Sequence, residues 1–149
     1  MKYLLDAGTV AGVLRGSPVV VLRVRMVDPA DVAIPAPAIQ ELHAAILRVR
    51  DAARRRQLAH DVDRLVAFVG VAPLTAHAAV AAARQAWRWP ARVARLSEAD
   101  RLNLAIARTS AAVLVSTRAL ALRSIPGVAV ENWHDSDTSA VGGTGPWPG

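Results

Sequence analysis

The sequence predicts an α/β fold in which a five-stranded parallel sheet lies between two layers of helices. Short apolar runs, too brief for helices, alternate along the chain with longer segments that carry apolar residues at helical spacing. Strands and helices that alternate favour right-handed crossovers, which make the strands parallel and cover both faces of the sheet. With 149 residues, 53% of them apolar, the chain is long enough to bury one core. We therefore expect one three-layer domain over residues 1–133, without an internal repeat.

The first predicted strand, Tyr3–Leu5, leads directly into an acidic residue, Asp6. The strand is apolar throughout, as expected of a central parallel strand that is buried on both faces. Ligands of open α/β sheets bind at the carboxyl ends of the strands, which makes Asp6 a candidate functional residue. The alternative is that Asp6 caps the helix predicted over Thr9–Leu14, since Asp is a favoured N-cap.

Capping and turn residues set the boundaries of the remaining elements. Ser17 followed by Pro18 is typical of a helix start, and Gly70 of a helix end. The sequence from Ser97 to Asp100 resembles a capping box. The segment 87–90 is expected to be a loop. Strands are expected at 3–5, 32–34, 71–74, 113–116 and 128–130, and helices at about 9–14, 18–27, 38–49, 58–69, 75–87 and 97–107. Residues 134–149 lack apolar periodicity and are expected to form a disordered tail.

Composition narrows the functional classes. The chain has no cysteine, which excludes disulfides and thiolate zinc sites. No apolar run reaches the length of a membrane span and the N-terminus lacks a signal-peptide profile, so we expect a cytoplasmic protein without a membrane partner. The net charge is +6, and all of the 18 basic residues except Lys2 are arginine. This charge favours an anionic partner such as RNA or an acidic protein, but only slightly, because an Arg and Ala bias also follows genome composition.

Several kinds of site are absent from the sequence. The glycines at 142–145 have no preceding strand and no following Lys, so they do not form a nucleotide-binding loop. No serine lies in a nucleophile elbow. The four histidines, His43, His60, His77 and His134, show no spacing typical of metal ligands, and we expect surface or packing roles for them.

Three carboxylates remain as candidate site residues. Asp6 ends the first strand, Glu41 lies early in the helix after the second strand, and Asp100 begins the helix before the fourth strand. In a parallel sheet these points can converge on the edge formed by the carboxyl ends of the strands. Converging carboxylates repel unless a hard cation such as Mg²⁺ or Mn²⁺ binds them, and such a cation can activate water toward a phosphodiester. The alternative is that Glu41 faces solvent and Asp100 interacts with the helix dipole.

A series of short segments forms a recognisable pattern over about residues 1–133. The segments are Lys2-Tyr-Leu-Leu-Asp6, Val32-Ala-Ile-Pro35 with Glu41-Leu42, Pro73-Leu-Thr75, Asp100 with Ala105-Ile-Ala107, Leu114-Val-Ser116, and Ile125-Pro-Gly-Val-Ala-Val-Glu-Asn-Trp133. No single segment is specific, but their order and spacing together are. In this pattern the chain resembles the VapC-type PIN-domain ribonuclease toxins of bacterial toxin–antitoxin pairs.

The resemblance implies a PIN-like domain in which Asp6, Glu41 and Asp100 bind metal and act in catalysis. It implies Mg²⁺- or Mn²⁺-dependent cleavage of an RNA substrate, a homodimer, and neutralisation by a cognate antitoxin protein. The arginine excess fits such an RNA-binding protein, because phosphate contacts supply most non-specific affinity for nucleic acid.

The chain departs from the family pattern at four positions. Ala7 and Gly8 stand where the family has a hydroxyl residue and Asn, Ala45 replaces a usual glycine, and Arg118 replaces an Asn or Asp. Two functional readings therefore stay open: a working metal-dependent ribonuclease, and a degenerate toxin that dimerises and binds an antitoxin without cleaving RNA.

Arg118 also has two interpretations. Placed after the fourth strand, its guanidinium can reach Asp6 or Asp100 and neutralise the cluster as a metal ion would, because its donors match carboxylates in a bidentate fork. The alternative is that Arg118 points outward and contacts RNA phosphate.

Overall fold

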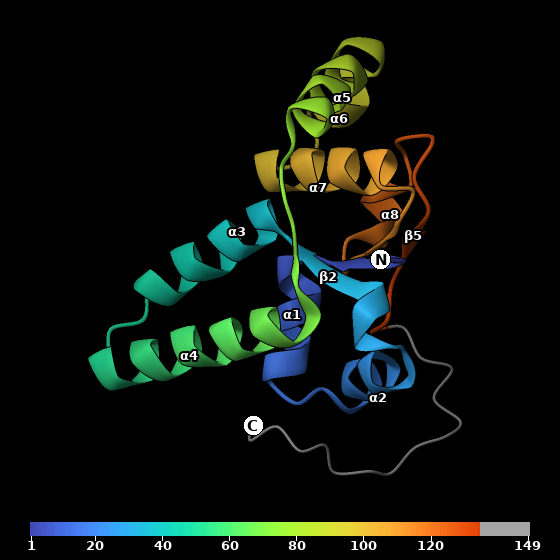
Figure 1. Cartoon of the computed structure of the whole chain (residues 1–149). Helices are drawn as coiled ribbons and strands as arrows, with labels where there is room; N and C mark the ends of the chain where they lie inside the picture. The colour runs from blue at the N-terminus through green and yellow to red at the C-terminus, as the bar shows by residue number, and fades with distance from the viewer. Residues whose placement is uncertain (135–149) are drawn as a thin grey trace.

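Five parallel strands lie between two layers of helices in the computed structural model, which describes residues 1–134 (Figure 1). The strands pair in the order β3-β2-β1-β4-β5, so β1 is central and both of its neighbours are reached by crossovers. The strands are β1 (Tyr3–Leu5), β2 (Val32–Pro35), β3 (Val71–Ala72), β4 (Val113–Val115) and β5 (Val130–Glu131). The helices are α1 (Ala7–Leu14), α2 (Pro18–Met26), α3 (Ala36–Leu47), α4 (Ala52–Val69), α5 (Ala76–Arg88), α6 (Pro90–Val93), α7 (Glu98–Thr109) and α8 (Ala119–Leu122), with a 3-10 turn η1 at Pro29–Asp31.

The core has one part on each face of the sheet. Successive strand residues point to opposite faces, so Leu4 joins the part formed with α5, α6, α7 and α8, whereas Leu5 joins the part formed with α1 to α4. Both leucines are fully buried. The layers can be followed in Figure 1, where α5, α6 and α7 lie above the sheet and α1 and α2 below it. The predicted three-layer α/β fold is confirmed.

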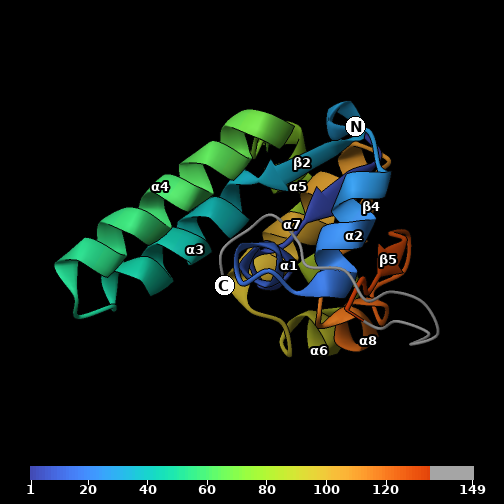
Figure 2. The same ribbon diagram turned by 90° about the horizontal axis from the view of Figure 1, so that it is seen from below.

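Helices α3 and α4 form an antiparallel pair that extends away from the rest of the domain, as Figures 1 and 2 both show. His43 of α3 lies 3.8 Å from Asp63 of α4, measured from Nε2 to Oδ1. At the sheet end of the pair, Leu42 and Leu65 are buried in the core. The extension leaves the first turns of α3 beside the sheet, where Glu41 is positioned.

Most differences from the predicted elements concern the ends of helices. Helix α1 begins at Ala7, two residues early, because Asp6 caps it. The segment expected as a loop at 87–90 is helical up to Arg88, and Pro90 opens the short helix α6, since proline is favoured at the first helical position. Strand β5 pairs at Val130 and Glu131, later than expected.

Among the described residues, no single helix is long and apolar enough to cross a membrane; α1 and α2 pass that test only as a pair bent by 103°. Several residues of this pair, including Val10, Val13 and Val20, are buried in the core. The tail predicted from residue 134 lies outside the described residues apart from His134. The imidazole of His134 lies against Gly12 of α1, at a place where a Cβ atom would clash with it.

Trp133 fixes the end of β5 to the domain. Its side chain is 2% exposed, its ring meets Tyr3 edge-on at 5.2 Å, and its Nε1 donates to Glu131 Oε2 at 2.8 Å. The expected packing of this residue on the body of the protein is confirmed.

We predict that Trp133→Ala lowers the free energy of unfolding by about 3 kcal/mol, as large-to-small core changes do. Urea unfolding followed by circular dichroism measures the loss. Trp87→Ala is the matched control, because Trp87 is 88% exposed, and it should change stability by less than about 0.5 kcal/mol. A loss below about 1 kcal/mol for Trp133→Ala would show that the ring does not support the fold as described.

Candidate functional site

The fold brings Asp6, Glu41 and Asp100 to the same edge of the sheet. Asp6 follows β1, and Glu41 lies in the second turn of α3, which leaves the carboxyl end of β2. Asp100 lies in the first turn of α7, which runs antiparallel to the strands and therefore begins at their carboxyl ends. The expected convergence of these side chains is thus present in the structure.

Asp6 caps helix α1, which is one of the two roles considered for it. Its Oδ1 accepts a hydrogen bond from Thr9 N at 2.8 Å and caps α1. The side chain is almost fully buried, and its Oδ2 has no hydrogen-bond partner among the described residues. Oδ1 therefore caps the helix. A buried carboxylate oxygen without a partner costs free energy, and a cation bound to Oδ2 would offset that cost.

Arg118 forms an ion pair with Asp100. Its Nη2 lies 2.6 Å from Asp100 Oδ1, and its backbone N donates to Ser116 Oγ at 3.0 Å in the turn after β4. The Asp100 side chain is 5% exposed and the Arg118 side chain 45%. The geometry agrees with the counterion interpretation of Arg118, while nearly half of the side chain still faces solvent.

Glu41 completes the cluster. Its Oε1 lies 3.8 Å from Arg118 Nη2, and its Oε2 is buried without a hydrogen-bond partner among residues 1–134. Burial raises the pKa of Glu41 above its ordinary value of 4.5, and the negative charges of Asp100 and Asp6 raise it further, whereas Arg118 lowers it. The carboxylates are therefore close enough to repel one another.

The raised pKa of Glu41 predicts a dependence of stability on pH. Because the folded protein favours protonated Glu41, this residue stabilises the fold below pH 4.5, and the benefit is lost as the pH rises through the raised pKa. We therefore expect Glu41→Gln to raise the melting temperature at pH 7 and to have no such effect below about pH 4.5. Thermal melts of the parent and Glu41→Gln over this pH range measure the difference in melting temperature. Glu98→Gln, at an exposed position, is the control. An equal shift of Glu41→Gln at both ends of the range would contradict the assignment.

Asp6, Glu41 and Asp100 are the residues of the cluster that could hold a hard cation. Asp6 Oδ2 and Glu41 Oε2 are buried oxygens without hydrogen-bond partners in the described part of the chain, and hard cations such as Mg²⁺ prefer carboxylate oxygens. In the arrangement seen, however, no three Asp, Glu or His side chains of the described part of the chain form a ready-made metal site. Since Arg118 holds Asp100, a cation and the Arg118 guanidinium would compete for the same carboxylates.

Thr117 is a site residue that the sequence analysis missed. A Cβ atom on Gly8 would lie 2.8 Å from Thr117 Oγ1 and 3.6 Å from Asp6 Oδ1. Gly8 therefore leaves room for the Thr117 hydroxyl beside the cluster. In the family pattern, the residue directly after the first Asp carries a hydroxyl. In this chain the hydroxyl near that place belongs to Thr117, in the turn after β4. The signal was the unexpected Gly8, because a glycine two residues after the candidate Asp6 indicates close approach of another group.

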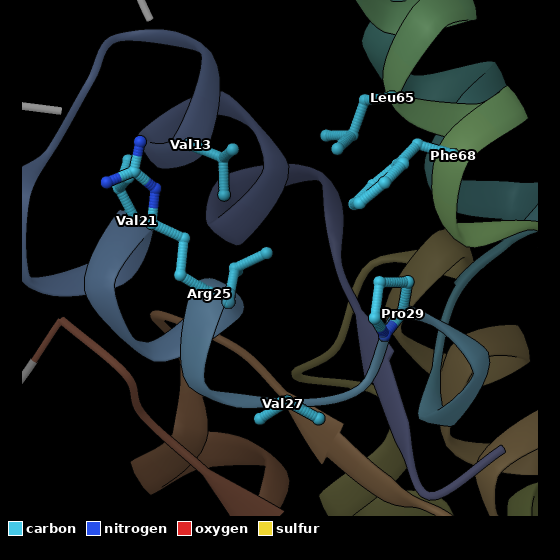
Figure 3. A pocket seen from close by; sticks show the side chains of 8 residues that line it. Val13, Val21, Arg25, Val27, Pro29, Leu65 and Phe68 are labelled. Carbon is cyan, nitrogen blue, oxygen red and sulfur yellow. The ribbon is translucent and has the colours of Figure 1, made fainter. Parts of the chain in front are cut away.

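An open apolar pocket of about 270 Å³ lies away from the cluster, between α1, α2 and α4 (Figure 3). Val13 and Leu65 line its floor, and Phe68, which is 62% exposed, lies at its side. Arg25 of α2 also lines the pocket, and in Figure 3 its guanidinium lies near Val21, on the side away from Phe68. The pocket therefore combines apolar walls with one positive charge.

No family model and no curated protein matches the sequence. Solved structures of toxin–antitoxin complexes do match the fold. A chain of VapBC2 from Rickettsia felis, bound to a DNA fragment from its promoter, matches with a TM-score of 0.77 and 17% identity over 89% of this chain and 99% of that chain. A chain of DNA-bound VapBC from Salmonella typhimurium gives 0.79 and 16% over 89% and 98%. The chain has a PIN-domain fold.

FitAcB from Neisseria gonorrhoeae extends the comparison, with a TM-score of 0.75 and 20% identity over 88% of this chain and 97% of that chain. These coverages mean that the PIN domain accounts for nearly all of the described residues. At this level of identity the likeness establishes the fold, and function has to be argued from the site.

Proposed function

We propose that this protein is the toxin of a toxin–antitoxin pair and acts as a metal-dependent endoribonuclease. The observation that carries the proposal is the cluster of Asp6, Glu41 and Asp100 at the carboxyl edge of the sheet, in which two buried carboxylate oxygens have no hydrogen-bond partner within residues 1–134. The PIN-domain fold and the net charge of +6 support a nuclease acting on RNA.

Each residue of the cluster has a role in this proposal. Asp6 and Glu41 would hold Mg²⁺ or Mn²⁺ through their free oxygens, and Asp100 would join them when Arg118 turns outward. When bound, the cation would lower the pKa of a water and polarise the phosphodiester. Arg118, released from Asp100, would then be free to pair with a phosphate of the substrate.

RNA cleavage with and without divalent cation tests the proposal. The parent protein is expected to cleave a structured RNA in Mg²⁺ or Mn²⁺ and not in EDTA. Cleavage that persists in EDTA would contradict metal dependence, and the loss of cleavage in an Asp6→Asn protein would exclude a contaminating nuclease.

The ion pair of Arg118 with Asp100 favours a second candidate function. A guanidinium is charged at any relevant pH, so Arg118 neutralises part of the cluster without a metal ion. A protein in which this pair never opens would retain the fold, the dimer and the antitoxin partner, but would not cleave RNA. Failure of the parent protein to bind Mn²⁺ would indicate this candidate.

The apolar pocket fits the proposed antitoxin partner. Several of the similar structures are VapBC complexes, and we propose that an antitoxin segment inserts an apolar side chain between Val13, Leu65 and Phe68. An acidic residue beside that side chain would pair with Arg25. The homodimer that the resemblance implies remains part of this proposal.

A further inference from the structure

Helix α5 presents an exposed tryptophan to solvent. Its inner side packs on α7 with Ala78 and Gln85 buried, while Trp87 is 88% exposed and Val80 is 49% exposed. Residues three and four apart lie on the same side of a helix. The exposed residues His77, Val80, Arg84, Trp87 and Arg88 therefore share one side, called here the α5 face.

The α5 face is positively charged. Residues 64–97 contain five arginines and neither Asp nor Glu. Arg84 and Arg88 flank Trp87 on the helix, and the guanidinium of Arg88 lies 5.2 Å from the centre of the Trp89 ring. This cation–π contact orients the Arg88 side chain toward Trp89. Within residues 1–134, neither Arg84 nor Arg88 forms an ion pair.

The charge decides between the partners that such a face can bind. A second copy of this chain would bring arginines against arginines, which repel. A single strand of nucleic acid can bind both the tryptophan and the arginines of this face, because its bases stack on exposed aromatic rings and its phosphates pair with arginine.

We propose that the α5 face binds single-stranded RNA, with a base stacked on Trp87 and flanking phosphates paired with Arg84 and Arg88. The choice of RNA rests on the proposed function. The stacking surface itself rests on the exposure of Trp87 and the charge around it.

The position of Trp87 connects the α5 face to the carboxylate cluster. Trp87 lies at the C-terminal end of α5, and only α6 and a short turn separate it from the first turn of α7, where Asp100 lies. Arg101 Nε donates to Val93 O at 3.1 Å, which fixes α6 to the start of α7. RNA held at Trp87 is thus held at the end of the α5–α7 pair that carries Asp100.

Fluorescence anisotropy with a labelled oligouridine of about 15 nucleotides tests this inference. Measuring in EDTA separates binding from cleavage. Trp87→Ala is expected to weaken binding about tenfold or more, whereas Trp87→Phe, which keeps a stacking ring, should stay close to the parent. Leu120→Ala is the matched control, because Leu120 is equally exposed, at 87%, but lies on α8. It should bind like the parent.

The salt dependence of oligouridine affinity separates the contribution of base stacking from that of the phosphate contacts. Each phosphate contact to a single strand adds about 0.7 to the slope of log K against log salt, so the double variant Arg84→Ala/Arg88→Ala should lower the slope by about 1.4. Trp87→Ala should leave the slope unchanged. Binding of a duplex RNA, whose bases are already stacked, should not depend on Trp87.

Three results would overturn the inference. Unchanged oligouridine binding by Trp87→Ala would remove the stacking role. Equal losses by Trp87→Ala and Leu120→Ala would show a nonspecific effect. A change from dimer to monomer in Trp87→Ala, measured by light scattering, would assign the α5 face to a second copy. Failure of the proposed nuclease function looks different, since the parent would then bind oligouridine normally in EDTA and not cleave RNA in Mg²⁺.

Discussion

Replacing Asp6 with Asn is expected to abolish RNA cleavage while the protein remains folded. Asn is as good a helix cap as Asp, so the hydrogen bond from Thr9 N to the side chain at position 6 is retained. The change removes one negative charge and the free oxygen Oδ2 from the cluster. Loss of even an outer-sphere partner of a metal costs up to about a hundredfold in activity, so loss of a ligand should cost at least that.

Although Asp6→Asn should lose activity, we expect it to gain thermal stability when no metal ion is bound. In EDTA, Asp6→Asn should melt above the parent, because one of three repelling carboxylates is gone. In Mn²⁺ the parent should gain stability and the variant should not, since only a protein that binds the ion is stabilised by it. A variant that cleaves RNA like the parent, or that gains equal stability from Mn²⁺, would contradict the assignment of Asp6.

Arg118→Asn is expected to have the second large effect, a gain of cation affinity of at least about tenfold, equivalent to about 1.4 kcal/mol. The change frees Asp100 Oδ1 from its 2.6 Å ion pair and removes a positive charge from the cluster. Asn also restores a residue type of the family pattern at this position. RNA cleavage at limiting Mn²⁺ should increase accordingly.

Without metal, Arg118→Asn should destabilise the protein by about 2 kcal/mol, because the charge-assisted hydrogen bond to buried Asp100 is lost. Urea unfolding in EDTA measures this loss, and Arg95→Asn is a control at an exposed arginine in the turn after α6 that makes no ion pair in the described part of the chain. If Arg118→Asn instead leaves metal affinity and stability unchanged and weakens only RNA binding, Arg118 is a phosphate contact.

The fold could be predicted from the sequence because its signals are local. Three apolar residues ended by Asp6, a proline after β2 and a capping serine before α7 each specify an element without reference to the rest of the chain. The order of these elements then requires a parallel sheet. The short helices α6 and α8 were missed because four-residue helices carry almost no periodic pattern.

The site could be predicted only in part. Convergence of Asp6, Glu41 and Asp100 follows from topology, since all three lie at the carboxyl edge of a parallel sheet. Which carboxylate the Arg118 side chain contacts depends on the backbone of the turn after β4 and on competition between Asp6 and Asp100. Spacing along the sequence determines neither. Thr117 was missed for the same reason, because its approach to Gly8 joins residues from distant parts of the chain.

The most direct test of the cation site is calorimetric titration of Mn²⁺ into the parent, Asp6→Asn and Arg118→Asn proteins. We expect the parent to bind one ion, Arg118→Asn to bind it at least about tenfold more tightly, and Asp6→Asn not to bind it. Equal Mn²⁺ affinity in all three proteins would contradict a cation site built from these carboxylates and opposed by Arg118.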